Sequence, residues 1–275
     1  MACDARAFWQ RLEAGPEIDA HLAFTDERVL AGKPDWVTAH RCDEASIFHL
    51  WGAAIAHCTG DYVAILSPYL IPENGWLEAM EDAANTGARA YFGPVEEAYG
   101  PAQPDIIGYL VEYCHFHRPL IGNHGEIPGT NLLVRSNELP PRDILQDEGF
   151  TKTNLLRAWK KEGYQPAYVE DAIVIHQRPY DGKTYRSRRF SHGRAFGASS
   201  RQGMTIAGLV LAVAKSVLLP FVRVERIWAR VRHLAQLRRT VRRHILAVWL
   251  AEAAWSFGEF IGLATGNPGD PRALD

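Results

Sequence analysis

The chain has 275 residues, of which 47% are hydrophobic and 23% are charged. This composition excludes an intrinsically disordered protein, a collagen-like repeat and a small disulfide scaffold, because enough apolar side chains are present to bury a core. The four cysteines, Cys3, Cys42, Cys58 and Cys114, form no C-x-x-C pair. We therefore expect neither a zinc ribbon nor a disulfide framework, and a reducing cytosolic setting without a secretory signal.

The net charge of −2 conceals an uneven distribution of charge along the chain. Residues 182–244 hold fifteen Lys or Arg and one acidic residue, Glu225, a net charge of +14. The rest of the chain holds fifteen basic and thirty-one acidic residues. Folding does not require such segregation, so the basic segment is predicted to meet an anionic phospholipid surface, a nucleic acid or an acidic partner.

The first two thirds of the chain alternate helix-like and strand-like segments. Apolar periodicity and turn residues predict helices at 4–13, 46–58, 75–84, 106–114 and 153–162, and strands at 18–25, 36–39, 62–66, 88–95, 131–135 and 167–175. Strands and helices alternating at this spacing predict an α/β domain over residues 1–180. We expect a mostly parallel sheet with helices on both faces.

Residues 181–275 predict a second, basic and helical region. Its apolar run Met204–Val222 is long enough for a transmembrane helix but contains Lys215 and Pro220. Amphipathic helices lying on an anionic membrane surface fit the mixture of apolar and arginine positions better. Packing within the protein is a further alternative, and nucleic-acid binding lacks a recognisable reader module. We expect a cytoplasmic protein peripheral to the inner face of the membrane.

The most informative stretch is GAAIAHCTGDYVAILSPYLIPENGWL, from Gly52 to Leu77. A helix ending in a glycine turn, a short strand, a loop and then a proline followed by G-W-L resembles the family-2 glycosyltransferases. Downstream, Gly129-Thr130-Asn131 with Arg135 resembles their G-x-N-x-x-x-R strand. The helix ending at Gly163-Tyr164 and the strand at 167–176 resemble two further motifs of the family, in the same order.

This resemblance implies a GT-A-like fold and the inverting transfer of a sugar from a nucleoside-diphosphate donor to a hydroxyl of a lipid, glycan or metabolite. It implies three groups of site residues: Asp26, Glu27, Ser67, Tyr69, Arg135, Arg188 and Arg189 for the donor nucleotide; Trp76, Asn131 and His176 for the acceptor; and Glu148 or Asp147 as catalytic base. Reasoning from the residues alone, Asp26 and Glu27 also fit a turn, and Asn131 and His176 also fit satisfied buried polar groups.

Three departures from the family pattern concern the donor site. The Asp-x-Asp that holds a divalent cation is replaced by Ser67, Pro68 and Tyr69. The family's opening strand is missing, and the position of the base falls on Thr151 and Lys152, just after Asp147 and Glu148. We therefore expect no divalent metal, with Lys152, Arg135 or the Arg188-Arg189 pair neutralising the diphosphate instead.

The same departures support an alternative function. A degenerate, non-catalytic transferase fold would serve as a membrane-peripheral binding or scaffold subunit, forming a homo-oligomer or pairing with an active transferase. The cluster Cys114-His115-Phe116-His117 with His124 is a weak candidate for zinc, because its ligands do not share one face of a helix or strand.

Overall fold

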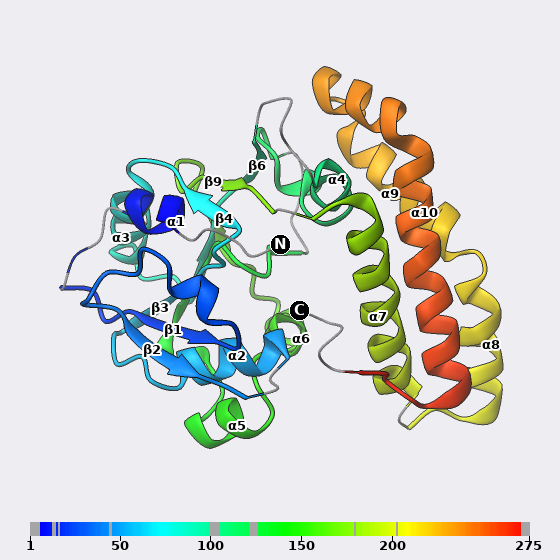
Figure 1. Ribbon diagram of the computed structural model, residues 1–275, viewed down its shortest axis with the longest axis horizontal. Coiled ribbons are helices and arrows are strands. Elements are labelled where there is room, and N and C mark those ends of the chain that lie inside the picture. The colour runs from blue at the N-terminus through cyan, green and yellow to red at the C-terminus, as the bar shows by residue number, and fades with distance from the viewer. Residues whose placement is uncertain are drawn as a thin grey trace. The chain divides into compact units, whose positions relative to one another are not determined.

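The computed structural model describes residues 6–12, 15, 17–43, 46–98, 105–120, 126–178, 180–201 and 203–270. The chain divides into two compact units, one formed by residues 1–100 and 116–178 and the other by residues 101–115 and 179–275. Figure 1 shows strands in the first unit and long helices in the second.

The first unit contains three short sheets. In the first, β1 (His21–Phe24) pairs with β2 (Thr38–Arg41); the second has the order β3 (Tyr62–Ile65), β7 (Leu132–Arg135), β5 (Ala90–Phe92) and β8 (Ala167–Tyr168); the third has the order β4 (Leu70–Pro72), β9 (Val174–His176) and β6 (Val95–Glu97). The helices are α1 (Arg6–Arg11), α2 (Ile47–Ile55), α3 (Trp76–Ala84), α5 (Arg142–Asp147) and α6 (Lys152–Glu162), with short 3₁₀ turns at Glu27–Leu30 and Ser136–Glu138.

The prediction of one mostly parallel sheet is wrong. The pairs β1–β2, β5–β8 and β6–β9 are parallel, whereas β7 runs antiparallel to both β3 and β5, and β4 runs antiparallel to β9. A short apolar run indicates a strand buried on both faces but carries no information about its direction. The architecture is mixed α/β, and β3, β5 and β8 point the same way, so their carboxyl ends meet the amino end of β7 at one edge.

Two predicted strands are each split in two where they face one another. The strand predicted at 88–95 breaks at Gly93 and Pro94, and the one predicted at 167–175 breaks between Tyr168 and Val174, a gap that contains Ala172. A Cβ on Gly93 would lie 1.9 Å from the carbonyl oxygen of Ala172. Only glycine allows the two backbones to approach this closely, so the sheet divides at this position.

Asn131 fills the gap between the two broken strands. Its amide nitrogen donates to the carbonyl oxygens of Pro94 and Ala172, both at 2.9 Å, and its amide oxygen accepts from the indole nitrogen of Trp76 at 2.8 Å. Its backbone nitrogen donates to the carbonyl of Ile65 at 2.9 Å. Asn131 is fully buried and has φ of 66°, a left-handed conformation that asparagine tolerates better than most residues.

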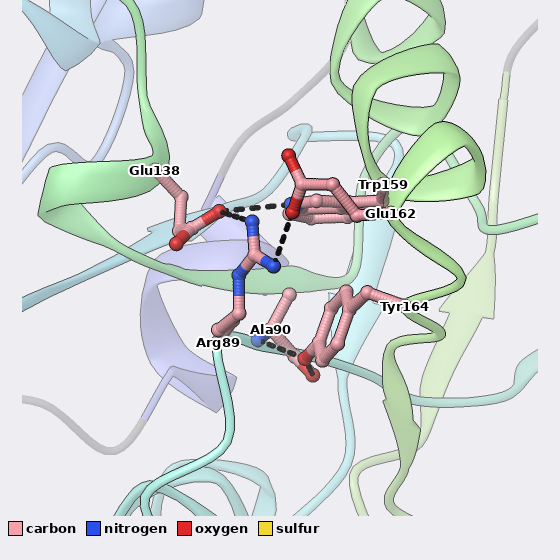
Figure 2. A network of polar contacts seen from close by, with 6 residues as sticks. All are labelled: Arg89, Ala90, Glu138, Trp159, Glu162 and Tyr164. Atoms are coloured by element: carbon pink, nitrogen blue, oxygen red, sulfur yellow. Dashed lines mark hydrogen bonds and ion pairs between the residues drawn. The ribbon is translucent and has the colours of Figure 1, made fainter.

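The C-terminal end of α6 is fastened to the start of β5 by a polar network (Figure 2). Arg89 forms 2.6 Å ion pairs with Glu138 and Glu162, and the indole of Trp159 donates to the same Glu138 carboxylate at 2.9 Å. The backbone nitrogen of Ala90 donates to the hydroxyl of Tyr164 at 2.8 Å. The hydrogen bond from Arg89 holds the pKa of Glu138 below its ordinary value. In the Gly-Tyr motif, Gly163 therefore caps the C-terminal end of α6 with φ of 70°, and Tyr164 attaches the following residues to β5.

Three histidines form a cluster between β1, β2 and the turn after α2. Nδ1 of His21 lies 2.9 Å from Nε2 of His40, and Nε2 of His21 lies 2.9 Å from the carboxylate of Asp19. The rings of His40 and His57 stack at 4.1 Å. Asp19 also accepts hydrogen bonds from the backbone nitrogen and hydroxyl of Thr59. This cluster ties the β1–β2 pair to the residues that lead into β3.

Described residues of the second unit form α4 (Ile106–Glu112), α7 (Gly182–Arg201), α8 (Ile206–Ser216), α9 (Leu219–Val231) and α10 (Ala235–Thr265). Helices α7 and α10 pack along their length (Figure 1). At Gly193, Gly197, Gly258 and Gly262 an added Cβ would lie 2.0 to 2.3 Å from a backbone oxygen of the facing helix. Two Gly-x-x-x-Gly pairs thus face each other and bring the two backbones into contact.

We expect Asn131→Gly to lower the free energy of unfolding by about 2 kcal/mol or more, because three buried partners of the amide lose their hydrogen bonds. Glycine keeps the left-handed backbone, so this variant isolates the side chain. Asn131→Ala should cost about 1 kcal/mol more through backbone strain. Urea unfolding measures both, with the exposed Asn154→Ala as control; equal stability of wild type and Asn131→Gly would contradict the role of the amide.

The stability of the first unit should fall as the pH drops below about 6.5. Burial lowers the pKa of His40 below its ordinary value of 6.5, and the neighbouring His57 and His21 lower it further. The unfolded chain therefore binds the proton more tightly, so the contribution of neutral His40 is complete above the unfolded value and is lost as the pH falls. Thermal unfolding of His40→Gln between pH 7.5 and 5 should show a flatter dependence than wild type, whereas the exposed His233→Gln should not.

Candidate functional site

The loop that follows β3 lies at the edge where β3, β5 and β8 end. Its Tyr69 accepts a 2.8 Å hydrogen bond at the backbone oxygen from the nitrogen of Gln177, and its backbone nitrogen donates to the hydroxyl of Ser67 at 3.4 Å. The guanidinium of Arg178 lies over the Tyr69 ring, 5.9 Å from its centre, within the range of a cation–π contact. The carboxyl ends of strands are where α/β folds usually place their ligands.

These residues do not fit a divalent cation of the family-2 type. Such a cation needs hard carboxylate oxygens, and Ser67, Pro68 and Tyr69 provide a hydroxyl, a prolyl ring and a phenol. Within the described parts of the chain, no group of three or more His, Cys, Asp or Glu side chains is placed to hold a metal ion.

A second cation, Lys152, lies at the same edge. Its ammonium donates to the carbonyl of Ile127 at 2.7 Å, and its methylene carbons lie beside Gly129, two residues before Asn131. Lys152 occupies the start of α6, where the family pattern places an acid. This edge therefore combines an aromatic ring, a hydroxyl and two cations, Arg178 and Lys152. Arg178 was not among the predicted site residues, although its position two residues after β9 was a usable signal.

Arg135, predicted to bind the donor, lies at the opposite edge of the sheet. It is the last residue of β7 and pairs in register with Tyr62, the first residue of β3. Its guanidinium donates to the Tyr62 hydroxyl at 3.0 Å and to the carbonyl of Gly87 at 2.9 Å. A cavity of about 180 Å³ also lies near the start of β3; it is lined by Ile55, Cys58, Thr59, Gly60, Val63, Ser136, Leu139, Pro140, Arg142 and Leu145. The structure does not bring Arg135 to Ser67 and Tyr69.

Asp26 and Glu27 follow the carboxyl end of β1. Glu27 is exposed and forms a 2.6 Å ion pair with Arg41 at the end of β2, while Asp26 is half-buried and its carbonyl accepts from Val29 in a turn. Because β1 and β2 are parallel, both acids and Arg41 share one edge of this pair. A surface ion pair of this kind contributes little to stability. Their predicted contact with the nucleotide stays a prediction.

The three predicted acceptor residues are all buried. Trp76 and Asn131 are hydrogen-bonded to each other, and His176 lies in β9 between Leu70 of β4 and Glu97 of β6. Through Asn131, Trp76 is joined to the end of β3 and to the residues before β6 and β9. Their burial in the free protein does not test whether these residues contact an acceptor, so that contact stays a prediction.

The predicted bases Asp147 and Glu148 are exposed at the end of α5, which packs on α2. A Cβ on Gly52 would lie 2.1 Å from the carbonyl oxygen of Leu145, so α5 touches the α2 backbone directly. Glu148 precedes Lys152 by four residues, which span at most about 14 Å of extended chain. Glu148 therefore lies no farther than this from the backbone of Lys152, and its predicted role as base stays a prediction.

Glu97, which the sequence analysis did not single out, is a further acid near this edge. It lies in β6, one strand away from His176 and two from Leu70, the residue after Tyr69. Burial raises the pKa of Glu97 to about 7. A carboxyl group with a pKa near neutral exchanges its proton readily at working pH, as a general base must. Its neighbour Glu96 is buried and paired with Arg118.

Arg188 and Arg189 belong to the helical unit. The guanidinium of Arg188 lies 4.3 Å from the ring centre of Tyr180. Arg189 is buried, donates to Glu252 at 3.0 Å and stacks at 4.3 Å over Trp255, and Arg223 approaches the same carboxylate at 3.4 Å. Arg189 thus already has a carboxylate partner inside its unit, and its predicted contact with a diphosphate stays a prediction. Of the weak zinc cluster, Cys114 is buried and His124 lies outside the described residues.

Comparisons with known proteins give a structural likeness but no match at the level of sequence. The chain matches no protein-family model and no curated protein sequence. Among solved structures it is similar to the mannosyltransferase PcManGT from Pyrobaculum calidifontis, described in complex with GDP-Man and Mn²⁺. The two chains are 15% identical; the match covers 94% of this chain and 84% of that chain, with a TM-score of 0.49.

Proposed function

We propose that the protein is a GT-A-type nucleotide-sugar transferase that binds its donor without a divalent metal ion. One observation carries the proposal: at the edge where the family motifs place the donor, Ser67, Pro68 and Tyr69 stand in place of the two carboxylates, and the guanidinium of Arg178 lies over the Tyr69 ring. Lys152 lies at the same edge, beside Gly129. The transferase class is inferred from the sequence motifs. The metal independence is inferred from the side chains at this edge, which do not include the two carboxylates of the family pattern. The donor is a nucleoside-diphosphate sugar and the acceptor a hydroxyl compound.

The cations suit the charge that develops during transfer. When the acceptor oxygen bonds to the sugar carbon, the bond between that carbon and the diphosphate oxygen breaks, and the departing diphosphate gains negative charge. An arginine fork donates two parallel hydrogen bonds to phosphate oxygens, and lysine adds a point charge. Donors that are already in place when the charge appears stabilise the transition state most. The ring of Tyr69 offers a face for the base or the sugar.

The acceptor hydroxyl must lose its proton to a base. Glu148 is the base that the sequence pattern favours, with Asp147 beside it, and Glu97 is favoured by its raised pKa and its place across β9 from Leu70. In either case the carboxylate takes the proton as the new glycosidic bond forms.

A non-catalytic binding subunit is the second candidate. It is favoured by the full use of Asn131 and Trp76 within the core and of Arg135 and Arg189 in contacts of their own. Such a protein would hold a nucleotide or an anionic lipid without turning it over, and it would pair with a second copy or an active transferase.

Nucleotide binding should depend on Arg178 and not on Arg135. We expect UDP or GDP to raise the unfolding temperature of wild type equally with manganese and with EDTA, because no carboxylate pair is present to hold the ion. Arg178→Met should weaken binding at least tenfold, while Arg135→Met, at the other edge, should bind as wild type. No stabilisation by either nucleotide, or loss with Arg135→Met alone, would overturn the donor site described here.

The identity of the base can be separated by three single variants. Release of nucleoside diphosphate from a panel of UDP- and GDP-sugars should fall by roughly 100-fold or more in the variant that removes the base, because general base catalysis contributes about that much. Glu148→Gln and Glu97→Gln are compared with Asp143→Asn, an exposed acid of α5, as control. Nucleotide binding without turnover in wild type would instead favour the binding subunit.

A further inference from the structure

Exposed apolar side chains are concentrated on the helical unit. Among the described residues, fourteen large hydrophobic side chains are exposed, and thirteen of them lie between Phe196 and Phe257; the other is Ile144, at 38% exposed. The most exposed include Ile206 at 84% and Leu246 at 68%. An apolar surface of this extent is unusual on a water-exposed face and marks a site of interaction.

The exposed apolar residues follow single faces of their helices. On α8 they are Ile206, Val210 and Leu211, and the face continues through Val217 and Leu218 at the bend. On α9 they are Phe221 and Val222, and on α10 Leu246, Leu250 and Phe257 share one stripe at spacings of four and seven. The rings of Phe221 and Trp249 are 5.9 Å apart, so the α9 and α10 faces are continuous.

Arginines occupy the opposite end of the same helix pair. Phe221 meets Trp249, and Arg242 lies 5.2 Å from the ring centre of Trp228, so α9 and α10 run antiparallel. Arg239 and Arg243 precede Leu246 on the exposed stripe of α10, and Arg226 and Arg232 are exposed on the facing end of α9 and its turn. The helix pair therefore has an apolar end near the α8–α9 bend and a cationic end at the α9–α10 turn.

A straight membrane span through 204–222 is not formed. Helices α8 and α9 together are apolar and long enough for a span, but they bend by 60° at Val217 and Leu218. Helix α10 has the length and the apolarity of a span, with a third of its most apolar window buried within the structure. Glu252 in its middle is buried against Arg189 and Arg223. The bend suits helices that enter one leaflet and return.

We propose that the exposed face of α8, α9 and α10 docks on an anionic phospholipid bilayer. The apolar residues around the bend enter the acyl region, and the arginines at the α9–α10 turn contact headgroup phosphates. Charge complementarity selects this partner, since residues 182–244 carry a net charge of +14 and an apolar face adjoins the cations. A nucleic acid would match the cations but not the apolar face, and a second copy would bring like charges together.

The proposal predicts binding of the full chain to vesicles of phosphatidylcholine with phosphatidylglycerol, measured by co-sedimentation. Arg239→Gln with Arg243→Gln should lower the partition constant roughly 30-fold, because each arginine near the surface contributes about fivefold. Leu218→Ser with Phe221→Ser should lower it at least tenfold. Lys160→Gln with Lys161→Gln, and Ile144→Ser, are matched controls in the first unit and should bind as wild type.

Added salt distinguishes the two contributions. Raising the salt from 0.1 to 0.5 M should weaken binding of wild type by a larger factor than binding of the double arginine variant, which keeps Arg226 and Arg232. Equal binding to neutral and anionic vesicles, or no binding to either, would overturn the proposal. Concentration-dependent dimerisation that the Leu218 and Phe221 changes abolish, without vesicle binding, would assign the face to a second copy. Because nucleotide binding is measured separately, failure here leaves the proposed function untouched.

Discussion

The first unit depends on one buried amide. The third sheet is separated from the second at Gly93 and Ala172, where the two backbones approach too closely for a regular ladder. The carbonyl groups at this break need donors, and Asn131 supplies both from one side chain while it accepts from Trp76. Its left-handed backbone turns the chain into β7 and lets its nitrogen reach Ile65. The loop after β3 is fixed because this residue joins the ends of three strands and one helix.

This constraint explains how the loop after β3 keeps its shape. Asn131 holds Ile65 at the end of β3 and Gln177 holds the backbone of Tyr69, and neither contact requires a metal ion. Side chains at the edge can therefore change while the edge keeps its shape. In the proposed function, Arg178 and Lys152 supply the positive charge that the family-2 pattern takes from a metal cation.

The helical unit follows a different packing logic. Glycines bring α7 and α10 into backbone contact, and Glu252 lies between Arg189 and Arg223 beside Trp255. Removing one partner of such a buried group would leave an uncompensated charge, so the network favours a single arrangement of the helices. Small residues and ion pairs thus complete an interior that also buries Leu237, Val241 and Val248, and further large apolar residues are left exposed. The proposed bilayer contact uses these exposed residues.

The sequence by itself determined most helices, the existence of most strands and the basic apolar C-terminal region, because apolar periodicity and glycine or proline breaks are local signals. It missed β4 and α5, which are short, and it gave the wrong direction for β7 and for the β4–β9 pair, because direction depends on where the chain re-enters the sheet. Only the tertiary structure separated Arg135 from Tyr69 and placed Arg178 there instead. Arg135 lies at the far end of the four-residue strand β7, so it reaches the opposite edge of the sheet although it is close in sequence to the residues before that strand. Tyr69 and Arg178 are 109 positions apart and meet because β4 pairs with β9.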